Sequence, residues 1–410
     1  MSAEQQLHRH VAPYQGSTGP FVRARRLDAW LVRTALAAQD RLRPHTSYVL
    51  DVSRAVAAGL VVLLHARIYA VGEVPDGFWA QLIYAITNCG TPAVFWFFVI
   101  SGYLVGGGVI AEVVQTGSFD ARRYLINRLA RLCIVLWPAL ALGALLDGIR
   151  VASWGLNAHA GYETAASYSV ATLAGNMLYL QTLLVPTFGS NAALWSLANE
   201  FWYYLLCPLL LAPFMVRRSR AVRASLFVAG LLLAGLLFRL NASLVWLFTL
   251  WCLGAATRFL PAAGMKSPVL AWCIAIGCMA AAPHLHPWIG LLATLLVGVT
   301  FANAILSTHR RTTVPSGRWV GAVRLLSGFS FSLYLIHLPL QHAVVTQIGR
   351  NADPFLHLAP RSLGAPAAIV ALVGVSYAAA FAFSLATEAH TAKLRRWLAA
   401  RVPRVRALAG

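Results

Sequence analysis

One apolar segment of the sequence carries three ionisable side chains at helical spacing. Arg54 and His65 are eleven residues apart in YVLDVSRAVAAGLVVLLHARIY. Along an α-helix this is about 16.5 Å and about 1100°, so the two side chains share a face within about 20°. Asp51 is within reach of the same face, and such a face should point into a helix bundle or a polar cavity. In the alternative interpretation, Asp51 and Arg54 are interfacial residues and His65 caps the other end of the span.

A second apolar segment, LWSLANEFWYYLL, has a carboxylate close to its start. Ser196 and Glu200 are four residues apart and stack on one helix face. Glu200 could accept a proton, bind a hydroxyl group or pair with a buried arginine. The aromatic residues Trp195 and 201–204 fit an interfacial belt. Their alternative function is stacking against a sugar ring.

Three further residues could contribute to a site. Ser101 lies in FFVISGYL, among glycines that favour close helix packing rather than a nucleophile. Tyr334 and His337 are three residues apart in SGFSFSLYLIHLPL, where His337 alone fits a packed histidine with one hydrogen bond.

A group of four arginines precedes another apolar segment in ARRYLINRLARLCIVLWP, namely Arg122, Arg123, Arg128 and Arg131. They fit either ordinary positive charge at a membrane interface or a site for a polyanionic cytoplasmic ligand, because guanidinium groups suit phosphates. Dinucleotide-binding, Walker-type, HExxH and GxSxG motifs are missing. The six cysteines form no CxxC pair, and no metal site is predicted.

The composition shows what kind of fold must hold these side chains. The chain has 410 residues, of which 59% are hydrophobic and 11% charged, with a net charge of +20. Soluble domains are about 45–50% apolar and about 25% charged. A nucleic-acid-binding protein would explain the charge but not the apolar excess, and intrinsic disorder is excluded by that excess. The sequence therefore predicts an all-α polytopic membrane protein with basic loops.

About ten transmembrane helices are expected from apolar stretches long enough to cross about 30 Å of hydrocarbon. They are 48–69, 90–110, 132–152, 194–215, 224–240, 244–260, 268–285, 287–306, 325–348 and 364–386. The stretch 171–185 is too short to span and is predicted to be an interfacial or re-entrant helix in an external loop.

The basic residues alternate with these spans. The N-terminal tail, 111–131, 216–223, 258–267, 307–324 and the C-terminal tail together hold 27 of the 33 Lys and Arg residues. Because basic residues concentrate in cytoplasmic loops, both termini are predicted to be cytoplasmic. We divide the chain into a tail over 1–47, a membrane domain over 48–390 and a basic tail over 391–410. Residues 21–42 are predicted to form an amphipathic helix on the membrane surface. The alternative is a helix that binds a partner.

Five pieces of the sequence, in this order, resemble the membrane-bound acyltransferase-3 family from about Tyr48 to Glu388. They are LDVSRAVAAGLVVLLH, FFVISGYL, RLARL followed by WP, WSLANEFWYYL and SFSLYLIHLPL. The resemblance departs from the family pattern at Ala55, where glycine is common, and at Glu388, which is followed by Ala-His instead of Arg-Pro. The hydrolase-like extracytoplasmic domain of some members is not expected here.

The resemblance implies an acyl-CoA donor, usually acetyl-CoA, that approaches from the cytoplasm, and a hydroxyl acceptor on a surface glycan that is often lipid-linked. Membrane lipids, acyl-CoA and this glycan are the expected partners, and nucleic acid is not. The family motifs fall on Arg54 with His65, on Ser101, on Arg128 with Arg131, on Glu200 and on His337.

Acyl transfer to a hydroxyl needs a base and stabilisation of an oxyanion. We expect His65 to be the base, because histidine titrates near neutral pH, although an acyl-histidine relay is a second possibility. Glu200 would orient His65 or hold the acceptor hydroxyl, and Arg54 would bind the phosphates or pantetheine of CoA. The expected nucleotide-phosphate ligands are Arg128 and Arg131, and the other expected substrate-binding residues are Ser101, Ser196, Trp195, Tyr334 and His337.

Two rival functions stay open from the sequence. The first is a proton-coupled transporter or flippase that uses Arg54, His65 and Glu200 as a relay, although the two related halves typical of transporters are not visible. The second keeps the acyl transfer but directs it to a small secondary metabolite.

Overall fold

The structure, a computed structural model, describes residues 44–72, 84, 87–155, 164–260, 264–285, 290–311, 313, 316–349, 355–358 and 364–402. Within them, helices joined by turns make up the fold, and the one β-bridge pairs Gln181 with Val185. The all-α prediction is therefore confirmed. The predicted surface helix over 21–42 lies outside the described residues.

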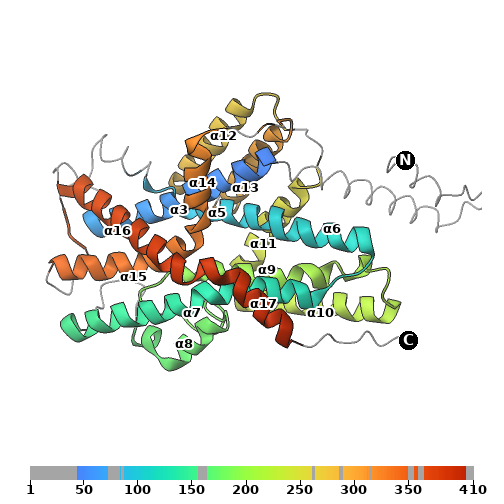
Figure 1. Ribbon diagram of the computed structural model, residues 1–410, viewed down its shortest axis with the longest axis horizontal. Helices are drawn as coiled ribbons and strands as arrows, with labels where there is room; N and C mark the ends of the chain where they lie inside the picture. Colours follow the sequence, from blue (N-terminus) through green and yellow to red (C-terminus); the bar gives the residue numbers. More distant parts are fainter. Residues whose placement is uncertain are drawn as a thin grey trace, which may run out of the picture.

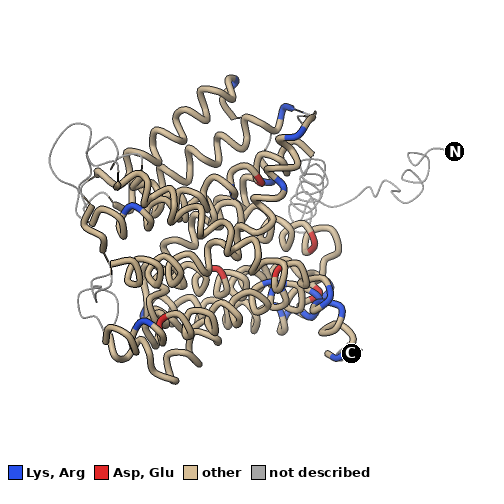
Figure 2. Tube along the Cα trace, turned by 60° about the vertical axis from the view of Figure 1, so that its left-hand side comes forward, with Lys and Arg blue, Asp and Glu red and all other residues tan. Residues whose placement is uncertain are grey.

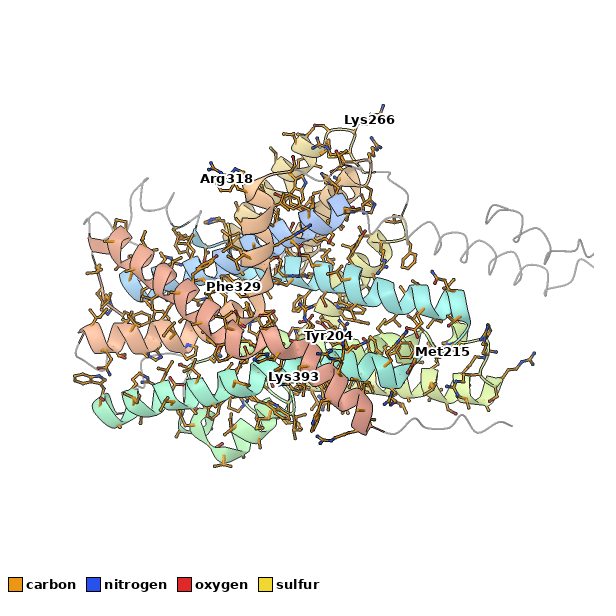
Figure 3. The ribbon with its side chains drawn as sticks, viewed as in Figure 1. Tyr204, Met215, Lys266, Arg318, Phe329 and Lys393 are labelled. Atoms are coloured by element: carbon orange, nitrogen blue, oxygen red, sulfur yellow. The ribbon has the colours of Figure 1, made fainter. Side chains whose placement is uncertain are left out.

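Six helices are long and apolar enough to cross a membrane. They are α3 (Pro44–Val71), the continuous helix Gly90–Thr116, α7 (Ala121–Trp154), α10 (Arg220–Leu240), α13 (Gly290–Thr308) and the helix Gly364–Arg401 that contains α16 (Gly364–Ala386) and α17 (Thr391–Arg401). A seventh arises if α14 (Arg318–Gly328) and α15 (Ser330–Gly349), which meet at a 56° bend, form one span. Figure 3 labels Phe329 at this bend. The chain is thus a multi-pass membrane protein.

Each of the ten predicted segments contains a helix, but three of these helices have only 17, 16 and 14 residues. They are α9 (Leu194–Leu210), α11 (Ala242–Thr257) and α12 (Pro268–Ala281). A turn follows α9, and α12 continues into a 3-10 turn that contains Pro283. By length and apolarity alone the described helices therefore support six to seven spans rather than ten. The predicted short helix at 171–185 begins as α8 (Val170–Met177) and ends in turns.

Helix α3 packs against the Gly90–Thr116 helix, α13, α14, α15 and α16. On one side of the bundle α7 packs along α15 and α17, and on the other side α12 and α13 pair with each other (Figure 1). The arrangement brings segments from the whole chain around one polar interior.

The close approach of two helices depends on glycine. The Gly90–Thr116 helix consists of α5 (Gly90–Ser101), a π-helical turn η2 (Gly102–Gly106) and α6 (Gly107–Thr116). A Cβ added at Gly102 would lie 1.8 Å from the carbonyl oxygen of Trp251, and one at Gly254 would lie 2.0 Å from that of Val99. This confirms the predicted packing role of the glycines after Ser101. The absence of side chains at these two glycines lets α11 pack directly against the π-helical turn η2. Turns of this type are common at functional sites.

The start of α15 is capped from the far end of the chain. Glu388 accepts hydrogen bonds from the backbone nitrogen of Ser332 at 3.3 Å and from its hydroxyl at 2.9 Å. Backbone N–H groups in the first turn of a helix lack partners within the helix and favour a carboxylate. Glu388, one of the two positions where the sequence departs from the family pattern, thus caps the start of α15.

Candidate active site

A cavity of about 260 Å³ opens between α3, α5, α7, α9 and α15, and we call it the arginine cavity. Among the residues that line it are Arg54, Arg128 and Arg131 together with Ser101 and Glu200. Of the four arginines grouped in the sequence before the third apolar segment, only the second pair lines this cavity. Three guanidinium groups around one cavity suit a ligand with several phosphate groups.

The arginines of this cavity are held by their neighbours. Arg54 pairs with Asp51 at 3.6 Å, in the i, i+3 relationship expected from the sequence. The guanidinium of Arg128 lies 6.0 Å from the ring centre of Tyr124 and 5.8 Å from that of Tyr204. Figure 3 labels Tyr204 in the middle of the bundle. Cation–π contacts of this kind orient a guanidinium without neutralising its charge.

Glu200 is the centre of a hydrogen-bond network in the arginine cavity. Ser101 donates its hydroxyl to Glu200 at 2.6 Å, and the hydroxyl of Tyr204 also donates to Glu200. The indole N–H of Trp251 donates to the oxygen of Ser101 at 3.1 Å. Glu200 is therefore fixed by two hydroxyl groups and faces the three arginines. These two hydroxyl groups, rather than His65, are the hydrogen-bond partners of Glu200 among the described residues.

A second cavity, of about 350 Å³, adjoins the first, and we call it the histidine cavity. His65 lines it together with Tyr69, Trp195, His342 and Phe355. Tyr69 stacks on His342, with ring centres 5.6 Å apart, and on Phe355 at 6.1 Å. An aromatic lining with a few polar groups is suited to an uncharged ring such as a sugar.

His65, which is partly buried, pairs with the buried His337. Nε2 of His337 lies 3.2 Å from Nδ1 of His65, and the two residues are 272 positions apart in the sequence. Nδ1 of His337 lies 2.8 Å from the carbonyl oxygen of Tyr334, and Nδ1 of His65 lies 2.8 Å from that of Val61. His337 is fully buried.

These contacts assign the tautomers of both rings. A carbonyl oxygen only accepts, so each Nδ1 carries a hydrogen. In a neutral His337, Nε2 then accepts, and His65 shares its Nδ1–H between this nitrogen and the carbonyl of Val61. Nε2 of His65 keeps its lone pair. The two contacts at Nδ1 therefore fix the orientation of the His65 ring and leave its Nε2 unprotonated.

The two cavities share a wall formed by Val94 and Tyr334, which line both. The hydroxyl of Tyr334 lies 2.7 Å from that of Ser196 and donates to the carbonyl of Ala193 at 3.2 Å. Arg54 and His65 thus lie on one helix but belong to two cavities on either side of this wall. The shared face expected from their spacing runs along both cavities.

A buried ion pair holds the loop that lines the histidine cavity. Both carboxylate oxygens of Asp147 accept from Ser190, one from the backbone nitrogen at 2.9 Å and the other from the hydroxyl at 2.7 Å. Arg150 lies 3.9 Å from the same carboxylate and donates to the hydroxyl of Tyr168 at 2.6 Å. Because Ser190 is part of the cavity lining, this pair positions one wall of the site.

Several of these residues were missed by sequence reasoning. Asp147 and Arg150 repeat the D-x-x-R spacing of Asp51 and Arg54, which could have drawn attention to them. Tyr204 stands four residues after Glu200 and could have been read as its neighbour on a helix. No spacing pattern in the sequence around Trp251 or His342 marks either residue as part of a site.

The other aromatic residues of α9 pack within the protein. Phe201 stacks on Tyr179 with ring centres 4.3 Å apart, Trp202 donates to the carbonyl of Tyr179, and Tyr203 donates to that of Leu244. Of the aromatic set in this segment, Trp195 and Tyr204 therefore line cavities and the rest stabilise the bundle. Among the residues that the structure describes, no group of three His, Cys, Asp or Glu side chains is arranged to hold a metal ion.

The sequence was compared with protein families, with curated proteins and with solved structures. Searches of curated proteins and of solved structures find no match. The model of the acyltransferase domain family Acyl_transf_3 matches residues 47–385, which include every residue described above for the two cavities. The chain therefore belongs to the acyltransferase-3 family, which indicates a membrane-bound acyltransferase.

Proposed function

We propose that the protein is an O-acyltransferase of the cytoplasmic (inner) membrane that moves an acyl group, acetyl in the simplest case, from acyl-CoA to a hydroxyl group of a surface polysaccharide or glycolipid. The observation that carries the proposal is the pair of adjoining cavities, one lined by three arginines and the other by a histidine base and aromatic rings. Phosphate groups and an uncharged sugar ring need these two different environments.

The donor would lie in the arginine cavity. Arg128 and Arg131 would bind the nucleotide phosphates of CoA, and Arg54 would bind the diphosphate or pantetheine portion. The size of the cavity suits the inner part of such a ligand better than the whole, so the nucleotide would extend toward the cytoplasmic start of α7. Glu200, which accepts from Ser101 and Tyr204, would hold these two side chains in place in the wall of the donor site.

The acceptor would lie in the histidine cavity, with its ring against Trp195. Nε2 of His65 would take the proton of the acceptor hydroxyl while the oxygen attacks the thioester carbonyl carbon at the shared wall. The carbon–sulfur bond then breaks, and the thiol of CoA leaves with the proton from His65. The hydroxyl groups of Tyr334 and Ser196 would rotate away from the carbonyl of Ala193 and donate to the oxyanion. His337 would hold the ring of His65.

The topology that fits this reaction has ten spans, both termini in the cytoplasm, an N-terminal tail over 1–47 and a C-terminal tail over 391–410. Its support is that most of the Lys and Arg positions coloured in Figure 2 lie toward one end of the described bundle, together with the positive-inside rule. The shorter helices α9, α11 and α12 would then cross with help from their flanking turns.

The experiment that tests the function uses membranes containing the protein and radiolabelled acetyl-CoA. We expect label in an alkali-labile ester on glycan or lipid. His65→Ala should lower transfer by about 10²–10⁴-fold, the usual contribution of a general base. His390→Ala, at an exposed histidine, is the matched control and should transfer normally.

Arg54→Ala separates donor binding from chemistry. Loss of a hydrogen bond to a charged group costs about 1.5–3 kcal/mol, so the KM for acetyl-CoA should rise by about 10–150-fold. Normal transfer by both the His65 and the Arg54 variants would refute this mechanism. If no acyl donor gives transfer, the transporter becomes the better explanation, and label retained on His65 would indicate the acyl-histidine relay.

A further inference from the structure

A second group of arginines lies outside both cavities. A groove of about 330 Å³ between the start of α7 and α17 is lined by Arg122 and Arg123 from α7 and by Arg395 and Arg396 from α17. Ile126, Asn127 and Ala399 complete the lining. None of these residues lines the arginine cavity, so the groove is a separate basic site.

Arg122 builds the groove by joining its two helices. Its Nε donates to the carbonyl of Val402 at 2.9 Å, and its Nη2 donates to the carbonyls of Ala399 and Val402. Carbonyl groups in the last turn of a helix lack partners and favour a cation. Since these acceptors are uncharged, Arg122 fixes α17 to α7 and keeps its own positive charge.

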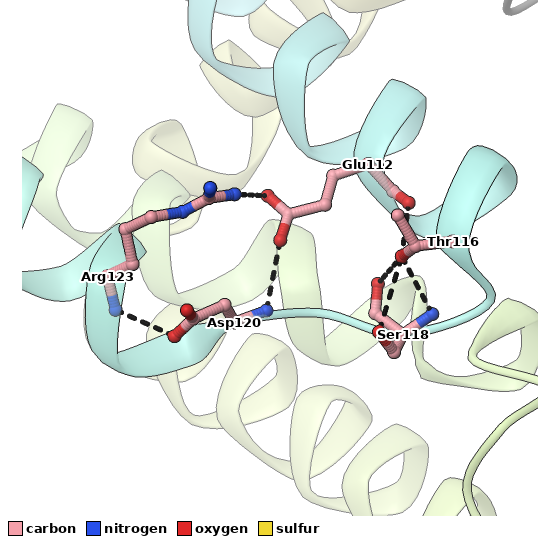
Figure 4. A network of polar contacts seen from close by, with 5 residues as sticks. All are labelled: Glu112, Thr116, Ser118, Asp120 and Arg123. Carbon is pink, nitrogen blue, oxygen red and sulfur yellow. Dashed lines mark hydrogen bonds and ion pairs between the residues drawn. The ribbon is translucent and has the colours of Figure 1, made fainter. Parts of the chain in front are cut away.

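Among the described residues, Arg123 is the one arginine of the groove that forms an ion pair. It pairs with Glu112 at 3.0 Å, and Glu112 also accepts from the backbone nitrogen of Asp120 at 3.1 Å (Figure 4). Within the described part of the chain, Arg395 and Arg396 have no ion-pair partner. The groove therefore carries about three uncompensated positive charges, held close together by a rigid helix pair.

The position of the groove indicates which anion it meets. Both of its walls belong to helices of membrane-crossing length, and the groove lies where these helices end. Trp397, on the same helix, has 51% of its surface exposed, and exposed tryptophan is typical of the level of lipid headgroups. Ile126 and Ala399 add an apolar side to the basic one, which matches a phosphate group joined to acyl chains.

We propose that this groove is a binding site for an anionic phospholipid, with Arg395 and Arg396 on the headgroup phosphate and with Ile126 and Ala399 beside the first carbons of its chains. A bound lipid of this kind would hold α17 against α7, one helix of the arginine cavity. The site does not depend on the proposed acyl transfer.

The test uses the full-length protein in nanodiscs of phosphatidylcholine, with phosphatidylglycerol added in steps and bound lipid counted by native mass spectrometry. Each basic side chain near an anionic lipid contributes about a factor of five. The double variant R395Q/R396Q should therefore bind phosphatidylglycerol about thirty-fold more weakly. The control is K393Q/R401Q, which removes the same charge from the same helix at residues outside the groove; Figure 3 labels Lys393 on α17.

The control should weaken binding by less than about threefold. Equal weakening by both double variants would mean general attraction to a basic surface and would overturn the proposal. In two further measurements, free CoA or inorganic phosphate is added as a competitor for the bound lipid. Displacement of the lipid by either at matched concentration would show that the groove binds a soluble phosphate instead.

A charge-conserving variant distinguishes loss of the binding site from loss of the folded structure. R395K/R396K keeps both charges, so its affinity for phosphatidylglycerol should stay within about fivefold of the unaltered protein. A loss as large as that of R395Q/R396Q, with an unchanged melting temperature, would also contradict a site built on charge.

Discussion

Removing the carboxylate of Asp147 should unfold the protein at a lower temperature and loosen its acceptor site. Asp147 and Arg150 are 3% and 1% exposed, and Asp147 also accepts two hydrogen bonds from Ser190. Asp147→Ala removes the carboxylate that lies 3.9 Å from the buried guanidinium of Arg150. Breaking a buried pair in this way costs about 3–5 kcal/mol. For a chain of this length the cost corresponds to a fall in Tm of roughly 3–6 °C.

The assay is thermal unfolding of the purified protein in one detergent, followed by tryptophan fluorescence. The matched control is Asp147→Leu with Arg150→Met, which removes both charges and fills the space with apolar atoms. Because replacing a buried ion pair by apolar residues is often close to neutral, the control should recover at least half of the lost Tm. An exposed pair gives a second comparison, since Glu112→Gln should lower Tm by less than about 1 °C.

The same variant tests the link from this ion pair to the site. Asp147→Ala frees the loop with Ser190, so the KM for the acceptor should rise while the KM for acetyl-CoA stays unchanged. The reasoning is refuted if Asp147→Ala melts within 1 °C of the unaltered protein. If the double variant melts as low as Asp147→Ala, the cost comes from the lost hydrogen bonds to Ser190 and not from the unpaired charge.

Two further predictions concern packing and capping. Gly102→Ala forces a Cβ to 1.8 Å from the carbonyl oxygen of Trp251, so the yield of folded protein in size-exclusion chromatography should fall at least tenfold. The control is Gly277→Ala, because no atom lies within 4 Å of a Cβ added at this helical glycine. This variant should keep a normal yield. Glu388→Gln weakens the cap on Ser332 and should lower the free energy of unfolding by about 1 kcal/mol, seen as a small fall in Tm; an unchanged Tm would show that the cap adds nothing to stability.

Much of the fold could be predicted from the sequence because helical periodicity is a local property. The spacing of Arg54 and His65 placed both on one face of α3, and the glycines after Ser101 predicted the close helix contact that Gly102 makes. The number of spans was harder to predict, because the length of α9 depends on the turn that follows Leu210 and not on apolarity alone.

The sequence by itself determined the class of protein, the helical segments and the polar side chains that cannot face lipid, since composition and periodicity follow from the order of residues. Only the tertiary structure decided which of these side chains meet. His65 pairs with His337 across 272 positions, and Glu200 meets Ser101 across 99. The division of Arg54 and His65 between two cavities depends on Val94 and Tyr334 from other helices. Contacts of this kind arise from packing among distant segments, which no local spacing specifies.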